Sequence, residues 1–157
     1  MSFEKCKNYF KSVGLEDRVQ EFNVSSATVE LAAVALNCDE DKIAKSLTFY
    51  GKENPIMIVV SGKSRIDNRK FKETFGLKAS MISFEDVPKL IGHNIGGVCP
   101  FCVNKEVKVY LDISLKKFDY VFPACGSSNS AVKLSINELE KHSSFYIPES
   151  TLFKSIK

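Results

Sequence analysis

The sequence lacks several features that would assign it to a specialised class of protein. Its 157 residues include no tryptophan, only eight glycines and only five prolines, which excludes collagen-like and low-complexity chains. No apolar run approaches the ~20 residues of a membrane span, and residues 1–11 lack the apolar segment of a signal peptide. We therefore expect a cytoplasmic protein without membrane contact.

A strong excess of one charge is also missing. The 22 Lys and Arg residues against 19 Asp and Glu residues give a net charge of +3, which excludes a polybasic protein and is compatible with a polyanionic partner. A hydrophobic content of 44% with 12 phenylalanines indicates a soluble globular chain. At this length we expect one domain over residues 1–157, and a monomer.

Cysteine spacing offers little support for metal or redox chemistry. The five cysteines are odd in number and irregularly spaced, which argues against a disulfide framework. Cys99 and Cys102 form a C-x-x-C unit, but the sequence has no second C-x-x-C or C-x-x-H to complete a zinc site, and no predicted helix follows as in thioredoxin-like proteins. We expect no metal and no cofactor; a thiol redox or metal protein is the least favoured alternative.

Hydrophobic periodicity predicts helices alternating with strands. Helices are predicted over residues 3–13, from a cap at Ser26 or Thr28 to residue 36, briefly after Asp39, and over 67–76 with Asp67 as its cap and Gly76 as its end. Two capping boxes, Ser83 with Asp86 and Ser135 with Glu138, predict a short and a closing helix. Strands are predicted over 45–50, 56–60, 77–82, 107–111, 120–123 and 132–134. The first two form a hairpin, and the uninterrupted apolar run at 56–60 predicts a strand buried on both faces.

In this order of elements, some strands are joined by links of hairpin length and others by helical crossovers. The sequence therefore predicts an α/β fold of the α+β type, with a mixed, largely antiparallel, barrel-like sheet flanked by helices.

Two features could carry chemistry. Gly96 and Gly97 allow positive φ and can present backbone N–H groups to a ligand, although a simple tight turn is the favoured explanation of the pair taken alone. By strand alternation Lys45 lies on the same face as Leu47 and Phe49, so its ammonium either reaches solvent at the strand end or holds a carboxylate or phosphate.

Taken together, the motifs resemble the YbaK family, also called the prolyl-tRNA-synthetase-associated editing domain. The resemblance runs along nearly the whole chain, in the order Lys45-Ser46-Leu47, Asp67, Gly96-Gly97-Val98-Cys99-Pro100, Asp112 and Cys125-Gly126. Membership implies a YbaK-like fold, no metal, and hydrolytic removal of a wrong amino acid from tRNA. Preorganised backbone N–H donors can stabilise the oxyanion of ester hydrolysis without a catalytic triad.

The resemblance also implies roles for particular residues. Lys45, Gly96 and Gly97 correspond to the catalytic positions, where the lysine contacts the aminoacylated 3′ end and the glycines hold the ester. The positions implied in substrate binding are Phe22, Ser46, Val98, Cys99, Pro100, Asp112, Cys125 and Gly126. Cys99 and Cys125 stand where relatives often have serine, which leaves the identity of the removed amino acid open.

The resemblance predicts a metal-independent aminoacyl-tRNA deacylase that acts in trans on mischarged tRNA such as Cys-tRNA(Pro) or Ala-tRNA(Pro). A hydroxyl of the tRNA or a thiol of the substrate could assist the attack. The expected partners are the acceptor end of aminoacyl-tRNA and prolyl-tRNA synthetase. A non-catalytic module that binds an aminoacyl or nucleotide group is the main alternative.

Overall fold

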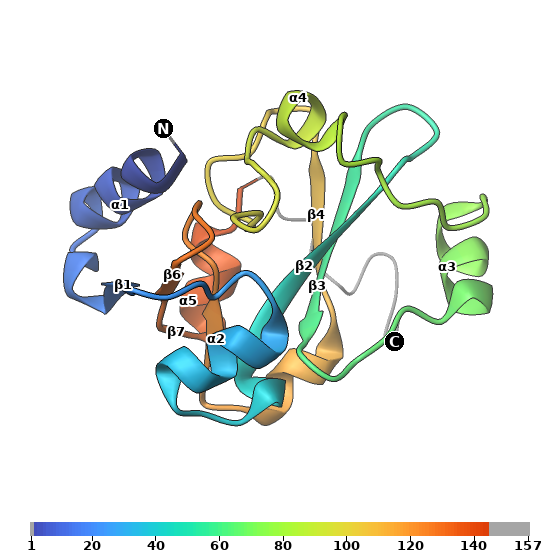
Figure 1. Cartoon of the computed structure of the whole chain (residues 1–157). Coiled ribbons are helices and arrows are strands. Elements are labelled where there is room, and N and C mark those ends of the chain that lie inside the picture. Colours follow the sequence, from blue (N-terminus) through green and yellow to red (C-terminus); the bar gives the residue numbers. More distant parts are fainter. Residues whose placement is uncertain (1, 145–157) are drawn as a thin grey trace.

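A curled, half-barrel sheet forms the centre of the protein. The structure, a computed structural model, describes residues 2–144. Five strands, β2 (Ile43–Phe49), β3 (Ile56–Ser61), β4 (Lys108–Leu111), β5 (Tyr120–Pro123) and β7 (Leu134–Ser135), pair in the order β4-β3-β2-β5-β7 (Figure 1). A separate two-stranded sheet joins β1 (Val19–Glu21) to β6 (Ser130–Val132).

The sheet mixes parallel and antiparallel pairs, as the sequence predicts. The β2–β3 hairpin is antiparallel, with Leu47 opposite Ile58, and β5 pairs with β7 antiparallel. The β3–β4 and β2–β5 pairs are parallel. The predicted α/β fold with a mixed, barrel-like sheet is therefore confirmed.

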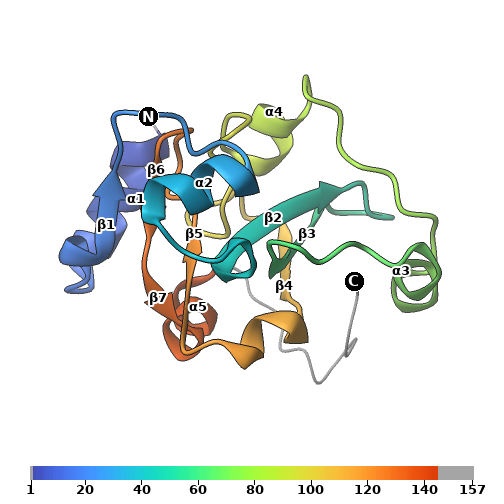
Figure 2. The ribbon, with the colours of Figure 1, turned by 60° about the horizontal axis from the view of Figure 1, so that its bottom comes forward.

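Helices surround the sheet. They are α1 (Ser2–Ser12), α2 (Val29–Leu36), α3 (Asn68–Phe75), α4 (Val87–Ile91) and α5 (Ile136–His142), with 3-10 turns at Glu16–Arg18, Glu40–Lys42 and Ile113–Lys117. Figures 1 and 2 show α1 and α3 at opposite ends of the molecule. Within residues 2–144 no helix has the length and apolar character needed to cross a bilayer.

Strand β3 is buried on both faces, which explains its uninterrupted apolar sequence. Met57 and Val59 enter the main core together with buried residues of α1, α4 and α5. Ile58 and Val60 face the other way, into a cluster with Phe71 of α3. The hairpin thus supports the packing on both sides of the sheet.

Most helix ends follow the predicted capping chemistry. The Thr28 side chain accepts the N–H of Leu31 at the start of α2, and the Asp67 side chain accepts the N–H of Lys70 in α3. Helix α3 ends at Gly76, which has a left-handed φ of 75°. These local signals are confirmed because each needs only residues close in sequence.

The predicted strand over residues 77–82 is wrong. This segment makes a single bridge, between Met81 and Phe49. The reason lies in its partner, because β2 ends at Phe49 and offers no further ladder.

The predicted strand over residues 132–134 is in fact two strands in different sheets. Val132 ends β6 opposite Val19, whereas Leu134 begins β7 opposite Val121. Between them the Lys133 N–H donates to the Arg18 carbonyl at 3.1 Å. The chain therefore changes sheets at Lys133.

The predicted capping box at Ser83 and Asp86 does not form. Asp86 itself precedes α4 and its side chain makes no capping hydrogen bond. Its carboxylate instead accepts the Tyr50 hydroxyl at 2.7 Å.

Of the single domain predicted over residues 1–157, residues 1 and 145–157 lie outside the described part.

The capping box of α5 gives a stability prediction. Ser135 Oγ accepts the Glu138 N–H at 3.1 Å, and Glu138 Oε1 accepts the Ser135 N–H at 2.9 Å. Ser135→Ala should lower the free energy of unfolding by about 1 kcal/mol, measured by urea titration. Asn137→Ala, at an exposed site in the same helix, should leave stability level or slightly raised. Equal stability of Ser135→Ala and wild type would contradict the stabilisation of α5 by the Ser135 cap.

The same box gives a pH dependence. Burial opposes ionisation of Glu138, but the Ser135 N–H and the Arg18 guanidinium outweigh it and lower its pKa. The stability that ionised Glu138 contributes is therefore full above the ordinary value of ~4.3 and is lost as pH falls through the lower folded-state pKa. The stability difference between wild type and Glu138→Gln should shrink over that acidic window.

Candidate functional site

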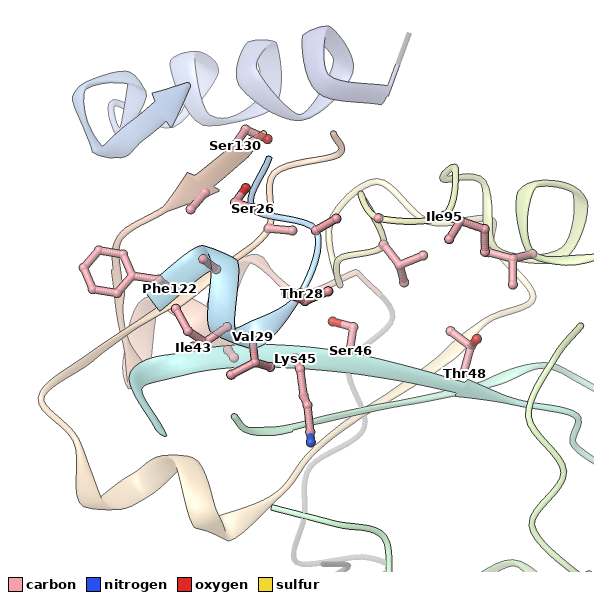
Figure 3. Close-up of a pocket in the computed structure, with 18 of the residues that line it drawn as sticks. Ser26, Thr28, Val29, Ile43, Lys45, Ser46, Thr48, Ile95, Phe122 and Ser130 are labelled. Atoms are coloured by element: carbon pink, nitrogen blue, oxygen red, sulfur yellow. The ribbon is translucent and has the colours of Figure 1, made fainter. Parts of the chain in front are cut away.

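A cavity lies between β2, α2 and two loops, where several segments distant in sequence meet. Its volume is about 230 Å³, and it is lined by residues from segments 26–32, 43–48, 81–87, 95–98 and 122–131 (Figure 3). Most of the lining is apolar. The cavity is smaller than the ~300–1,000 Å³ of pockets for drug-sized ligands, so it suits a small group.

Strand alternation places polar groups of β2 in this cavity. Ser46 and Thr48 point toward the loop that carries Ile95 (Figure 3). The Ser46 Oγ is buried and has no hydrogen-bond partner among the described residues. A buried hydroxyl without a partner costs free energy of folding, so Ser46 is a candidate for contact with a bound polar group.

Lys45 borders the cavity, but its ammonium extends to the opposite side of β2 from Ser46 and Thr48 (Figure 3). The predicted alternation of β2 is thus correct. Burial and then the nearby Arg65 lower the pKa of Lys45, against the effect of nearby carboxylates. No ion pair holds its ammonium within residues 2–144. The ammonium is therefore unpaired within the described residues, on the face of β2 that lies away from Ser46.

The glycine loop is shaped differently from the prediction. The positive φ, 90°, belongs to Gly96 and not to Gly97. Gly97 is required for space, because a Cβ there would lie 2.6 Å from backbone atoms of both Gly126 and Ser127. The loop thus packs backbone against backbone, and this contact sets the position of Gly96 and Val98 in the cavity wall.

The structure brings four of the predicted site residues together and leaves seven outside the cavity lining. Lys45, Ser46, Gly96 and Val98 line the cavity. Those outside it are Gly97, Phe22, Cys99, Pro100, Asp112, Cys125 and Gly126. Their implied roles in catalysis or substrate binding stay predictions.

The seven residues have evident structural positions. Cys99 and Cys125 lie in the main core, and Phe22 packs beneath α2. The Asp112 side chain accepts the Ser114 N–H at the start of a 3-10 turn. Pro100 is buried, and Gly126, with a φ of 87°, packs against the backbone of residue 2.

Several lining residues were not predicted. Thr48 has the same parity as Ser46 and could have been found from strand alternation alone. Ser26, Phe84 and Phe122 come from segments that only the tertiary structure brings together. No periodicity or motif signals such a junction.

Metal-binding groups lie away from this cavity. Among residues 2–144, the one group of three or more side chains that could hold a metal ion is Cys6, His93 and Cys99. None of them lines the cavity. Among the described lining residues Lys45 is the single titratable one, so they offer neither a carboxylate nor an imidazole as a base.

Gly97 gives a test of how the loop is held. Gly97→Ala should lower the free energy of unfolding by about 1–3 kcal/mol, because its Cβ meets the backbone of Gly126 and Ser127. Gly14→Ala is the matched control, since Gly14 has a φ of 80° but open space around its Cβ. This control reports backbone strain without a collision, about 1 kcal/mol. Urea titration of both variants measures these losses. A loss in free energy of unfolding at Gly97 no larger than that at Gly14 would contradict the close contact.

Comparison with known proteins gives three informative similarities. The chain is 48% identical over 144 residues to the uncharacterized protein YwhH of Bacillus subtilis (strain 168), covering 91% of this chain and 92% of YwhH. It is 27% identical over 85 residues to the proline–tRNA ligase of Bacillus cereus (strain AH820), a match that covers 54% of this chain and 15% of the ligase. A crystal structure described as that of a candidate trans-editing enzyme for prolyl tRNA synthetase matches with a TM-score of 0.82 and 28% identity over 98% of each chain.

A family match covers the cavity walls. Residues 24–142 match the aminoacyl-tRNA editing domain, and this range contains every lining segment of the cavity. The similarity in fold extends over nearly the whole chain. The chain therefore belongs to the aminoacyl-tRNA editing domain family, the YbaK-like family that its motifs resemble.

Proposed function

We propose that this protein is an aminoacyl-tRNA deacylase that hydrolyses mischarged tRNA in trans, with Cys-tRNA(Pro) or Ala-tRNA(Pro) as substrate. Membership of the editing family supports an aminoacyl-tRNA substrate. Similarity over 98% of both chains to a candidate trans-editing enzyme for prolyl tRNA synthetase supports action in trans and prolyl-tRNA synthetase as partner. Hydrolysis in trans removes amino acids that a synthetase pocket rejects poorly, since one methylene is worth only ~1–3 kcal/mol.

The observation that carries the proposal is the unpartnered Ser46 hydroxyl in a small apolar cavity. An aminoacyl group has a short side chain and a few polar atoms at one end. Such a group would fill the apolar cavity and offer the Ser46 hydroxyl the hydrogen bond that it lacks within the described residues.

The loop opposite β2 can stabilise the transition state. The Gly97 N–H is already engaged, because it donates to the Asn94 carbonyl at 3.0 Å. The N–H groups of Gly96 and Val98 have no acceptor among residues 2–144, and both residues line the cavity. We assign these two N–H groups to the oxyanion that forms when water attacks the ester carbonyl. Gly97 then acts by positioning the loop.

The residues that line the cavity limit the groups that can take part in proton transfer. Within residues 2–144 no carboxylate or imidazole borders the cavity, so this part of the chain supplies no general base there. The proton of the attacking water reaches the departing ribose oxygen through solvent or through a group of the substrate that gives up its own proton as it accepts another, such as the neighbouring ribose hydroxyl or a cysteinyl thiol. The C–O bond of the ester breaks, and the products are a free amino acid and a tRNA with a free terminal hydroxyl. This chemistry requires no metal in the cavity.

Turnover on defined substrates tests the proposal. The full chain, at a concentration far below that of the tRNA, is incubated with Cys-tRNA(Pro), Ala-tRNA(Pro) and Pro-tRNA(Pro), with and without prolyl-tRNA synthetase. We expect many cycles of cysteine or alanine release while the prolyl ester persists. Binding of the aminoacyl-tRNA without release of the amino acid would indicate a non-catalytic aminoacyl-binding module and overturn the proposal.

Lys45→Ala tests the cation at the edge of the cavity. If Lys45 holds a phosphate of the tRNA, deacylation should fall at least tenfold, about 1.4 kcal/mol in transition-state stabilisation. Stability should stay level, because Lys45 has no ion pair within the described residues. Lys45→Arg should recover activity only in part, since the planar guanidinium of arginine differs in shape from the compact ammonium of lysine.

The matched control for Lys45 is Lys63→Ala. The Lys63 side chain is 61% exposed and lies 4.0 Å from Asp39, so its loss should leave deacylation unchanged. Wild-type turnover in Lys45→Ala, or an equal loss in both variants, would remove Lys45 from the site.

Ser46→Ala separates binding from folding. Removing a buried hydroxyl that has no partner should raise the free energy of unfolding or leave it level, whereas deacylation should fall because the aminoacyl group loses its anchor. Ser64→Ala is the control, since Ser64 is buried with its Oγ 2.7 Å from that of Ser61 and should lose stability by about 1 kcal/mol. Unchanged deacylation in Ser46→Ala would show that this hydroxyl does not hold the substrate.

A further inference from the structure

A second cluster of chemically reactive groups lies outside the cavity. The side chains of Cys6 in α1, His93 after α4 and Cys99 in the glycine loop place one ligand atom each within 4.8 Å of one another. All three residues are at most 1% exposed. The cluster joins the first helix to the loop that forms a cavity wall, and the proposed deacylation uses none of it.

The spacing of the two sulfur atoms fits a tetrahedral metal site. The Sγ atoms of Cys6 and Cys99 are 3.8 Å apart. Tetrahedral zinc with Zn–S bonds of ~2.3 Å separates two sulfur ligands by ~3.8 Å. A metal could therefore bind both sulfur atoms without a change in their separation.

His93 lies in contact with the Cys99 thiol. The Cys99 Sγ is 3.5 Å from His93 Nε2, which matches the ~3.5 Å between a sulfur and a nitrogen ligand of tetrahedral zinc with bonds of ~2.3 and ~2.0–2.1 Å. The same Nε2 lies 2.6 Å from the Phe101 carbonyl, so a metal bound there would take the place of the proton in that hydrogen bond. The ring proton would then be on Nδ1, which is buried without a hydrogen-bond partner among the described residues.

Cys102 lies beside the cluster in an unusual backbone conformation. Its φ of 55° is in the left-handed region, which is costly for a residue with a side chain. Its Sγ lies 4.0 Å from the carbonyl of Lys5, the residue before Cys6. Because zinc sites commonly take two cysteines two to four residues apart, the second cysteine of the C-x-x-C unit is the candidate for the fourth ligand.

We propose that Cys6, His93 and Cys99, with Cys102 as the fourth ligand, form a structural site for a soft divalent cation, zinc foremost. Each thiol releases its proton to solvent as its sulfur binds the metal. Three thiolates and one Zn²⁺ carry a net charge of −1. The metal would fasten α1 to the loop at residues 93–102.

This proposed site departs from the expectation, based on cysteine spacing, of no metal. The C-x-x-C unit supplies only Cys99 and Cys102 as neighbours in sequence. The other two ligands come from the folded chain, since Cys6 lies 93 residues before Cys99. A zinc site of this composition has the same thiolate and imidazole ligands as known structural zinc sites.

Metal analysis of the full chain tests the proposal. Protein purified under reducing, oxygen-free conditions and incubated with zinc should retain about one zinc ion per chain after desalting. Cys6→Ser and Cys99→Ser should lose most of that zinc. Cys38→Ser is the matched control, because Cys38 is half-buried outside the cluster, and it should keep the wild-type content.

A cobalt titration keeps the test independent of whether the variants fold. Wild-type protein freed of metal should bind one equivalent of Co²⁺ with the intense thiolate-to-cobalt absorption and visible bands of a tetrahedral site, and zinc should displace it. Three results would overturn the proposal: no retained metal, a cobalt spectrum without thiolate absorption, or a disulfide between Cys6 and Cys99 under the same reducing conditions. None of these results bears on deacylation, so they leave the proposed function untouched.

Discussion

The contact between the backbone at Gly97 and the turn at residues 126–127 determines the shape of the site. A Cβ on Gly97 would come within 2.6 Å of this turn, so two loops distant in sequence touch without a side chain between them. The same turn region holds the opposite wall, because the Ser128 carbonyl accepts the Ser26 N–H at 2.7 Å. Gly126 packs in turn against the backbone of residue 2. One turn thus positions the glycine loop, the segment before α2 and the start of α1.

This arrangement explains how a cavity with so little polar chemistry could be an active site. Its lining has one titratable residue, Lys45, and a hydroxyl, that of Ser46, without a partner among the described residues. Backbone N–H groups are fixed dipoles, and a loop held by close backbone contact needs no reorganisation as charge develops. The proposed catalysis therefore depends on positioning and on groups of the substrate, and the fold supplies the positioning.

The sequence predicts what depends on neighbouring residues and misses what depends on distant ones. The capping of α3 by Asp67 and the burial of β3 on both faces follow from local chemistry and hydrophobic pattern, and both are confirmed. The change of sheets at Lys133 depends on a bond to Arg18, more than one hundred residues away. Strand pattern alone cannot indicate such a bond, because alternation is the same in either sheet.

The candidate site shows the same division. Four of the residues indicated by motif order, Lys45, Ser46, Gly96 and Val98, line one cavity, and their roles stay predictions. Other motif residues, such as Cys125 and Asp112, are buried where they support the fold. A motif therefore marks positions that a family needs, both for chemistry and for packing, and only the tertiary structure distinguishes them.

The most direct test of the central claim, that this cavity holds the aminoacyl end of tRNA, is a crystal structure with a non-hydrolysable analogue. Adenosine carrying an alanyl or cysteinyl group through an amide in place of the ester has the required shape and cannot turn over. The aminoacyl group should lie between Ser46 and the loop at residues 96–98, with its carbonyl oxygen directed at the N–H groups of Gly96 and Val98. An analogue bound elsewhere on the protein, or a cavity left empty at saturating analogue, would contradict the account.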